Sequence, residues 1–406
     1  MDRNQNKPLS GIKVVELATF VAATVPGRLM ADMGAEVIKI EGPKGDPWRV
    51  LSRDLTNTTI DEIPDFDVFN LGKRSICLDL KKPEGLAFLE KLLESADVFI
   101  TNTRQQSLVK MGLDVATLRA KYPNLIYANV TGYGEKGPQR NDPGFDNVAF
   151  WTKSGFRMDM ITKTPGSYPL GSPTGGGDSV TGSILFGEIM LALYQRAKTG
   201  CGDHVSVSLF NAGLWTFCGP IIEAQDKYKM KFPKERLDSL PVNTVYECAD
   251  GEWISVTILD YGRLAPKFYA LLGITEAIEK IGAETYGESN AKSAEIIPLI
   301  EASIATKTSQ EWMQLLKEAD IVCGLGNHFS DATKSEQAWA NEYLQEHTCR
   351  NGSVCIVPTS PYRLDSCGVA PSRLAPLPGE HSQEVLKEYG YSAEKIAQLY
   401  SDGTVC

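Results

Sequence analysis

Residues 12–41, IKVVELATFVAATVPGRLMADMGAEVIKIE, decide the fold class of this 406-residue chain. Ile12–Leu17 is a short apolar run that predicts a buried strand, and Glu36–Glu41 predicts a second one. Between them, the residues around Pro26–Met33 favour a helix, and Gly34 is suited to end it. This succession of strand, helix and strand is typical of proteins built on a parallel sheet.

The alternation continues through the first half of the chain. Further strands are predicted at Ser75–Leu80, Asp97–Thr101, Leu125–Val130 and His204–Ser208, and helices at Pro83–Ser95, Val115–Lys121 and Ser179–Lys198. The last of these helices is long and apolar, and Gly200 follows it. Strands that alternate with helices predict an α/β fold with a doubly wound parallel sheet.

The pattern changes after this region. Short strands at Thr244–Cys248 and Trp253–Ile258 flank Asp250-Gly251, a dipeptide typical of a β-hairpin turn. Helices are expected at Ala265–Leu272, Ala291–Ile304 and Ser309–Ala319. We therefore expect residues 226–334 to form a smaller α+β domain.

The C-terminal tail carries one predicted strand, Ser353–Val357, and two short helices near Ser382–Tyr389 and Ser392–Tyr400. Ser392 is a favoured type of residue for a helix N-cap. Because the tail is too short to fold alone, we expect it to pack on the first domain. That domain would then combine residues 1–225 with 335–406.

Composition narrows the class of function. The formal net charge is −10 and no basic block occurs, which argues against nucleic acid or an anionic membrane surface as a partner. No run of about 18 apolar residues is present, so no membrane span is predicted. The polar first residues lack the apolar core of a secretion signal, and a cytoplasmic location is expected.

Nine cysteines and four histidines are scattered along the chain. No pair of cysteines has the C-x-x-C spacing, so neither a disulfide framework nor a zinc site is predicted. The histidines lie far apart in sequence, and we expect no metal site. Reduced cysteines would fit the cytosol.

Gly132–Gly137 matches the G-x-G-x-x-G pattern and follows a predicted strand. A dinucleotide-binding fingerprint must open a helix, whose N-terminus holds the pyrophosphate. The next residues, Pro138–Gly144, predict a loop instead, so a nicotinamide oxidoreductase is the weakest alternative. The chain also lacks the G-x-x-x-x-G-K-[ST] phosphate loop and the G-x-S-x-G nucleophile elbow.

Thr174–Ser179, TGGGDS, is the sharpest local feature. Its three glycines leave the backbone open to a ligand, and Asp178 stands where the long helix is predicted to begin. Two interpretations remain open at this point. Asp178 could simply cap the helix. Alternatively, its carboxylate could attack a thioester to form an acyl-aspartyl anhydride, with nearby backbone N–H groups stabilising the oxyanion.

Cations recur near the ends of the predicted strands. They are Lys39, Lys44, Arg49, Lys73, Arg74, Lys81, Lys82, Arg104 and Lys110. Doubly wound folds bind ligands at the carboxyl ends of their strands, where such side chains would neutralise the phosphates of a ligand such as CoA. The alternative is an ordinary solvated surface. Asp142–Asp146, DPGFD, is a second candidate loop, in which Phe145 is expected to pack inward and the role of Asp146 is open.

Several stretches, in order along nearly the whole chain, resemble the family III CoA-transferases. They are LSGIKVVELATF, ADMGAEVIKIEGPKGDPWR, LGKRSICLDLKKPEG, DVFITNTRQQSLVKMGLD, TGYGEKGP, GGGDSVTG and PGEHSQEVLKEYGYS. The resemblance implies a Rossmann-like large CoA-binding domain of residues 1–225 and 335–406 and a small domain of residues 226–334. It also implies a homodimer of two interlocked chains.

The resemblance also assigns site residues. The family's nucleophile is an aspartate in a glycine-rich turn before a long helix, and Asp178 matches it. The family's CoA contacts fall on Ala22, Leu78, Lys81, Asn102, Thr103, Arg104, Lys110 and Met111. The related α-methylacyl-CoA racemases carry an acid–base histidine where this chain has Phe145. A phenyl ring cannot transfer a proton, so a racemase is the second interpretation.

Four stretches resemble the family members that act on 2-hydroxy acids. They are LATFVAA, TGYGEKGP, PGFD and EQAWANEYL. These include the 2-hydroxyisocaproate and phenyllactate CoA-transferases of amino-acid-fermenting anaerobes. The resemblance implies CoA transfer from an acyl-CoA, expected to be an enoyl-CoA, to an (R)-2-hydroxy acid through an aspartyl-CoA thioester. Val21, Phe145 and Trp151 would suit an apolar acid.

The implied partners are therefore small molecules. CoA thioesters and a small carboxylic acid would be substrates, and no permanently bound cofactor is expected. A CoA-binding protein without catalysis is an alternative from another class of function. The intact Gly177-Asp178 pair argues against it.

Overall fold

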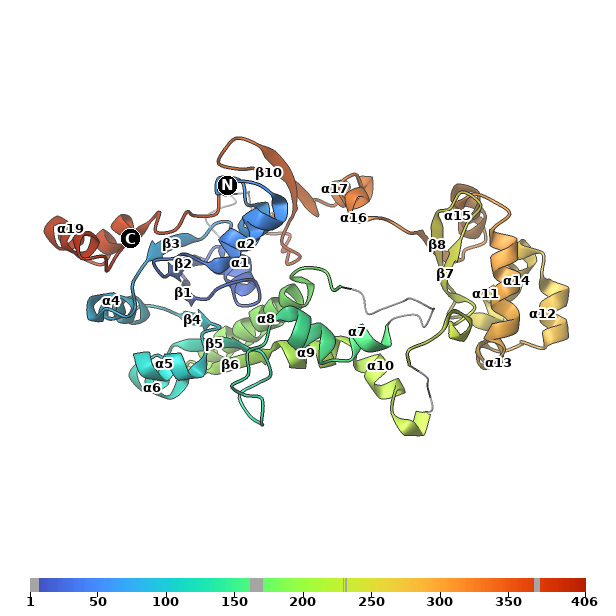
Figure 1. The fold of residues 1–406 in the computed structure, drawn as a ribbon, viewed down its shortest axis with the longest axis horizontal. Helices are drawn as coiled ribbons and strands as arrows, with labels where there is room; N and C mark the ends of the chain where they lie inside the picture. Colours follow the sequence, from blue (N-terminus) through green and yellow to red (C-terminus); the bar gives the residue numbers. More distant parts are fainter. Residues whose placement is uncertain (1–6, 161–170, 229, 231, 369–372) are drawn as a thin grey trace. The chain divides into compact units, whose positions relative to one another are not determined.

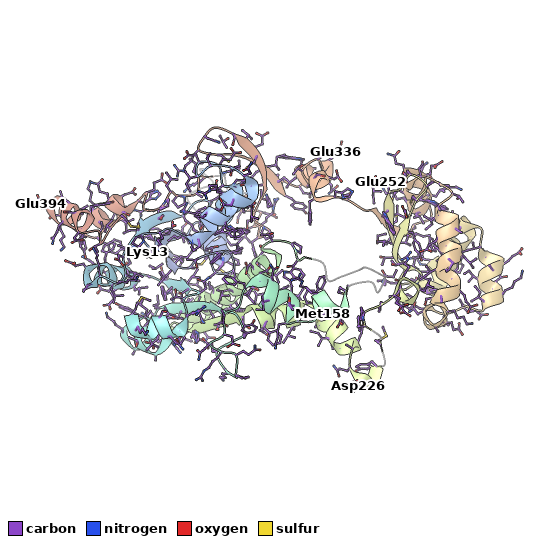
Figure 2. The ribbon with its side chains drawn as sticks, in the orientation of Figure 1. Lys13, Met158, Asp226, Glu252, Glu336 and Glu394 are labelled. Carbon is purple, nitrogen blue, oxygen red and sulfur yellow. A yellow bond between two sulfur atoms is a disulfide. The ribbon has the colours of Figure 1, made fainter. Side chains whose placement is uncertain are left out.

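The computed structural model describes residues 7–160, 171–228, 230, 232–368 and 373–406. Residues 1–6, on which part of the argument against a secretion signal rests, lie outside this range. The chain divides into two compact units (Figure 1). Unit 1 comprises Met1–Phe156, Gly171–Ile222 and Glu336–Cys406, and unit 2 comprises Arg157–Leu170 and Glu223–Ser335. Figure 2 labels Glu336, where the chain returns to unit 1, and Glu252 in unit 2.

Unit 1 is built on a six-stranded parallel sheet. Its strands are β1 (Lys13–Leu17), β2 (Glu36–Glu41), β3 (Arg74–Cys77), β4 (Val98–Thr101), β5 (Ile126–Thr131) and β6 (His204–Ser208). They lie in the order β3-β2-β1-β4-β5-β6, and each neighbouring pair is parallel. This is the Rossmann-like order, so the predicted α/β fold class is confirmed. The order reverses between β1 and β4, which makes that point the expected place for a ligand.

Helices cover both faces of this sheet. Val14 and Val15 point to opposite faces because side chains alternate along a strand, and they belong to two separate cores. The first core includes residues of α1 (Thr24–Asp32), α8 (Gly176–Thr199) and α9 (Leu209–Thr216). The second includes residues of α4 (Pro83–Leu93), α5 (Gln105–Met111), α6 (Val115–Lys121), α18 (Ser382–Glu388) and α19 (Ala393–Ser401).

Shorter elements complete unit 1. They are α2 (Pro47–Thr56), α3 (Pro64–Asp67), the π-helix η1 (Asp146–Thr152), α17 (Glu336–Ala340) and the antiparallel pair β10 (Leu344–Thr348) and β11 (Val354–Pro358). The helices α7 (Phe156–Asp159) and α10 (Cys218–Glu223) lie where the chain passes between the units. Ser392 caps α19, as predicted, by accepting a hydrogen bond from the Lys395 N–H.

Unit 2 has its own sheet and core. The antiparallel strands β7 (Asn243–Glu247), β8 (Trp253–Thr257) and β9 (Val322–Leu325) lie in the order β7-β8-β9. The helices are α11 (Tyr261–Leu272), α12 (Thr275–Ile281), α13 (Tyr286–Ala291), α14 (Ser293–Ile304), α15 (Ser309–Glu318) and α16 (Phe329–Ala332), with short 3-10 turns at Asp226–Tyr228 and Arg236–Asp238. The expected hairpin is present, whereas the predicted helix Ala291–Ile304 is interrupted at Lys292.

The C-terminal tail covers the outer edge of β3. The Ser75 carbonyl accepts a hydrogen bond from the His381 N–H at 2.9 Å, and the Ser75 N–H donates to His381 Nδ1 at 3.3 Å. The Cys77 N–H donates to Ser382 Oγ at 3.1 Å, and the Cys77 carbonyl accepts from the Cys406 N–H at 3.4 Å. The tail therefore occupies the place of a further strand.

Cys77 and Cys406 are joined by a disulfide. The expectation that no disulfide forms is wrong for this pair, because sequence spacing carries no information about residues 329 positions apart. An antiparallel bridge between Leu78 and Val405 brings the two cysteines together. The other seven cysteines are free thiols. In the part of the chain that the structure describes, none of the helices is both long and apolar enough to cross a membrane.

Candidate functional site

A cavity of about 1020 Å³ opens at the carboxyl ends of β1, β4 and β5. Its lining comes from the loop after β1, the residues after β4, the loop 131–145 after β5 and the first turn of α8. Doubly wound folds bind ligands at this position. The only carboxylate that α8 contributes to the described lining is that of Asp178.

Asp178 is the third residue of α8. The helix begins at Gly176, earlier than predicted, and its N-cap is Gly175 in a left-handed conformation with φ of 69°. The interpretation of Asp178 as a helix cap is therefore wrong, because its backbone is already helical and no side-chain capping bond forms. The side chain is left to line the cavity.

A second carboxylate, Asp146, lies beside this turn. Asp146 begins η1, and its Oδ2 accepts a hydrogen bond from Trp151 Nε1 at 3.0 Å. Its Oδ1 lies so close to Gly177 that a Cβ there would be only 2.3 Å away. Glycine is required at position 177 because any side chain would displace Asp146.

The backbone N–H groups of Gly177 and Asp178 face Asp146. Burial raises the pKa of Asp146. The hydrogen bond from Trp151 and, after it, these two N–H groups offset only part of that effect, and neither N–H is placed for a full hydrogen bond to Oδ1. From the sequence, nearby backbone N–H groups in general were expected to stabilise an oxyanion, and these two are the backbone groups next to the Asp178 side chain. Because they are turned toward a carboxylate, the structure gives that expectation no support.

Burial and, second, the negative charge of Asp146 raise the pKa of Asp178 to about 7. Near neutral pH, Asp178 therefore exists both as a carboxylic acid and as a carboxylate. A strongly perturbed pKa in a cavity is typical of a group that reacts. Asp178 is the leading candidate for the reacting group on this ground and on its position.

The loop after β1 brings an aromatic ring into the cavity. Phe20 has a positive φ of 62°, and its N–H donates to Asp46 Oδ1 at 3.1 Å. Next to it, the Thr19 N–H donates to Asn102 Oδ1 at 3.1 Å, and Asn102 Nδ2 donates to the Thr19 carbonyl at 2.7 Å. This pair of hydrogen bonds ties the loops after β1 and β4 together across the switch point.

Phe145 stands at the cavity with 59% of its surface exposed. Its ring meets that of Phe20 edge to face, with centroids 5.3 Å apart. The expectation that Phe145 packs inward is wrong, because its partner is another residue of the cavity wall. Val21 is buried, and Trp151 donates its indole N–H to Asp146. Of the three apolar residues expected to suit an apolar acid, only Phe145 is therefore in the cavity lining.

Several of the cations that were expected to meet phosphates are buried in ion pairs. Lys39 Nζ lies 2.9 Å from Asp46 Oδ2, Lys73 Nζ lies 2.9 Å from Glu16 Oε2, and both lysines are fully buried. In the same way, Arg49 pairs with Glu41 at 2.6 Å. The phosphate-binding hypothesis is wrong for these three cations, since a ligand cannot reach them.

The residues assigned to CoA fall into two groups. Ala22, Asn102, Thr103 and Arg104 line the cavity. The other four are not in its lining. Leu78 is buried beside Val405, and Lys81 is exposed after β3. Lys110 and Met111 lie in the last turn of α5. The structure thus brings half of them together around Asp178.

Sequence reasoning missed several polar residues of the lining. Arg119 and Arg140 join Arg104 there. His204 also lines the cavity, with its Nε2 2.7 Å from Asn129 Oδ1 and 3.3 Å from Glu135 Oε1. The signal for both arginines was available, because each follows a predicted strand as the selected cations did.

Comparison with known proteins identifies the family. Residues 9–382 match the model of the family described as CoA-transferase family III. The chain belongs to the family III CoA-transferases. The resemblance found in the sequence, and the expectation of an enzyme of this family, are confirmed.

Two named proteins resemble this CoA-transferase along almost its whole length. It is 35% identical over 389 residues to the (R)-2-hydroxy-4-methylpentanoate CoA-transferase of Clostridioides difficile, covering 96% of this chain and 97% of that one. It is 36% identical over 412 residues to the cinnamoyl-CoA:phenyllactate CoA-transferase of Clostridium sporogenes, covering 99% and 98%.

A solved structure shares the fold of this CoA-transferase. The crystal structure of a variant of the Rv3272 protein of Mycobacterium tuberculosis superimposes with a TM-score of 0.82. The two chains are 25% identical, and the match covers 94% of this chain and 98% of that one.

Proposed function

We propose that this enzyme transfers CoA from an acyl-CoA to a 2-hydroxy acid, with Asp178 as the nucleophile. The observation that carries the proposal is a half-buried carboxylate of raised pKa in the lining of a large cavity at the switch point of the sheet. The names of the two clostridial relatives support the class of acceptor. An enoyl-CoA donor is proposed on the same ground.

The reaction proceeds in two symmetrical halves. Ionised Asp178 attacks the thioester carbonyl of the donor, which forms a mixed anhydride and expels CoA thiolate. The thiolate then attacks the aspartyl carbonyl of the anhydride, so that an aspartyl-CoA thioester forms and the donor acid leaves. The acceptor carboxylate repeats these steps in reverse and regenerates Asp178. One thioester is broken for each one made, so no ATP is consumed.

Exposed arginines support the binding of CoA. Arg104, Arg119 and Arg140 line the cavity and are exposed, which suits the phosphates of CoA better than the buried lysines. Asn102 and Thr103 lie beside Arg104 and are proposed to contact the same ligand. For Leu78, Lys81, Lys110 and Met111 the proposal rests on the family resemblance alone.

The test is CoA exchange followed by mass spectrometry. The enzyme receives an enoyl-CoA and a panel of free acids, namely (R)-2-hydroxyisocaproate, (R)-phenyllactate, carnitine and oxalate. We expect a new 2-hydroxyacyl-CoA, and no product with Asp178→Asn. Asp142→Asn, which removes an exposed carboxylate from the same cavity, is the control and should leave transfer intact.

Trapping separates an enzyme from a binding protein. Hydroxylamine added after the acyl-CoA should convert the aspartyl thioester into a hydroxamate at Asp178, located by peptide mass spectrometry. Transfer by Asp178→Asn at the normal rate, with the asparagine still intact, would exclude the nucleophile assignment. Acyl-CoA binding without hydroxamate or exchange would favour the non-catalytic alternative.

Epimerisation of the acyl-CoA is the competing activity. Phe145 occupies the position of the racemases' acid–base histidine, but His204 places an imidazole in the described lining of the same cavity. We expect His204→Gln to retain CoA transfer. An enoyl-CoA has no stereocentre at its α-carbon, so the stereochemical test offers a 2-methylacyl-CoA as donor, and the wild type should leave its configuration unchanged. If the wild type epimerised this donor without transferring CoA, and His204→Gln lost that activity, epimerisation would replace CoA transfer as the first proposal.

Assembly and location remain proposals. We propose that residues 1–225 and 335–406 form the CoA-binding domain, residues 226–334 form the small domain, and two chains form an interlocked homodimer. A cytoplasmic location and the absence of a permanent cofactor are proposed with them. Light scattering of the purified protein tests the dimer.

A further inference from the structure

Three side chains that could bind a metal ion gather in unit 1, outside the lining of the cavity. They belong to Asp67, His347 and Cys349. Their potential ligand atoms lie within 4.8 Å of one another, and His347 Nε2 is 3.1 Å from Asp67 Oδ2. Asp67 ends α3, and His347 lies in β10. The fold thus joins two segments that are 280 residues apart.

The β10–β11 pair places a fourth side chain, Cys355, on the same face. His347 is the direct cross-strand partner of Cys355, and directly opposed residues of an antiparallel pair share a face. Cys349 lies two residues beyond His347, so alternation returns it to that face. The Cys349 thiol acts on the pKa of Cys355, so the two side chains are neighbours, although the group of ligand atoms within 4.8 Å of one another is made of Asp67, His347 and Cys349 without Cys355.

Three of these four residues are buried, and Cys355 is partly exposed. Asp67, His347 and Cys349 are 8%, 1% and 3% exposed. Two thiols beside a carboxylate form a poor apolar core, since each keeps a polar atom out of water. A divalent cation would make the burial of these sulfur atoms favourable, because it stabilises both of them as thiolates.

We propose that Asp67, His347, Cys349 and Cys355 bind one Zn²⁺ ion in a closed, four-coordinate structural site. One carboxylate oxygen, one imidazole nitrogen and two thiolates are ligands that zinc prefers, and four protein ligands leave no open position. Zn–S and Zn–N bonds of about 2.3 and 2.0 Å bring ligand atoms closer together than the 4.8 Å within which those of Asp67, His347 and Cys349 lie, so the site would contract on binding.

Such an ion would hold the β10–β11 hairpin to the end of α3, close to where the hairpin contacts the segment before α3. Two hydrogen bonds already link these parts: the Asn351 N–H donates to the Asp61 carbonyl at 3.3 Å, and Asn351 Nδ2 donates to Glu62 Oε2 at 2.7 Å. Since Zn²⁺ binds the folded chain, the ion would stabilise unit 1 by mass action. The site takes no part in the proposed CoA transfer.

The test uses the full-length protein loaded with Zn²⁺ under reducing conditions and then freed of excess metal. Elemental analysis should find about one zinc per chain, with about two protons released on binding. Co²⁺ in place of zinc should give the visible and thiolate charge-transfer bands of a tetrahedral sulfur site. Both signals should disappear in Cys349→Ser and in Cys355→Ser and persist in Cys201→Ser and Cys218→Ser, which alter exposed thiols.

Asp67→Asn keeps the test decisive if the cysteine variants misfold. The amide matches the carboxylate in size, and the variant should fold while its zinc affinity falls roughly tenfold or more. A wild-type protein that retains no zinc after loading would overturn the proposal. So would zinc retained equally by the cysteine variants, or a Cys349–Cys355 disulfide in place of a metal in freshly purified protein.

Discussion

Asp146 adds its negative charge to the burial that raises the pKa of Asp178 to about 7. The two carboxylates come from different elements, η1 and the first turn of α8. They approach each other because Gly177 leaves room for Asp146 Oδ1. The ionisation of the proposed nucleophile is therefore controlled in part by a residue that does not itself react.

The rate of aspartyl-thioester formation should rise as the pH increases through about 7, because only the ionised form of Asp178 attacks. Asp146→Asn removes one of the two causes of the raised pKa, so the rising limb should move to lower pH. Single-turnover rates across the neutral range measure this shift. Asp142→Asn is the control, and an unmoved limb in Asp146→Asn would show that the charge does not act on Asp178.

Stability should depend on the same group. The folded state raises the pKa of Asp178 above its ordinary value of 3.8, to about 7. The folded chain therefore holds this proton more tightly than the unfolded chain, and the free energy of unfolding falls as the pH rises between these two values. Asp178→Asn abolishes the charge, so the variant should be more stable than the wild type above pH 7. Denaturant titrations at acidic and neutral pH test this, and equal pH dependence of the two proteins would contradict it.

Gly177→Ala should impair both folding and transfer. Its Cβ would lie 2.3 Å from Asp146 Oδ1 and 2.4 Å from Phe150 Cγ, so the carboxylate or the ring must move. Gly187→Ala, in the same helix but with no atom within 4 Å of its Cβ, should be neutral or stabilise the protein by about 1 kcal/mol. Thermal unfolding and exchange rates of the pair separate the effect of the site from helix propensity.

Glu16→Gln should destabilise the protein by about 3–5 kcal/mol, because it leaves the buried ammonium groups of Lys39 and Lys73 without a shared carboxylate. Glu36→Gln breaks a surface pair with Arg74 and should cost less than about 1 kcal/mol. Denaturant unfolding of both variants measures the difference. Similar losses in the two proteins would mean that the buried pairs contribute no more than surface ones.

Cys406→Ser should lower the free energy of unfolding by about 2–4 kcal/mol in the absence of reductant, because the Cys77–Cys406 disulfide closes a long loop. With reductant present, wild type and variant should unfold alike. Alkylation followed by mass spectrometry should show two protected cysteines in the unreduced wild type. The seven free cysteines should be alkylated in the same sample, and they serve as the internal standard for complete labelling.

The sheet of unit 1 could be predicted because its buried parallel strands appear in the sequence as short apolar runs. Glu36–Glu41 and His204–Ser208 have the predicted bounds. The π-helix at Asp146–Thr152 was missed, since a single wide turn after Pro-Gly has no periodicity to detect. The strand Leu344–Thr348 was missed because all its residues except Leu344 are polar or charged, the buried His347 included, so it has no apolar alternation to detect.

The site was predicted where one local pattern sufficed and missed where distant segments meet. Asp178 could be selected from TGGGDS. Asp146 was noted in DPGFD with its role left open, but its place beside Asp178 could not be predicted, because no sequence signal brings the two together. Lys39 and Lys73 were misjudged because a lysine in a strand, or just before one, gives no sign of the buried carboxylate that it meets in the fold. The same reason explains why Asp67 and His347 escaped notice as a pair.

The pairing of β3 with the C-terminal tail has a consequence for how chains can associate. The outward N–H and C=O groups of both Ser75 and Cys77 have hydrogen-bond partners within the chain. An exposed edge would be a template for strand addition by a second copy and for aggregation. At this edge the groups are already paired within the chain. Two copies that associate therefore cannot do so by extending the sheet from β3.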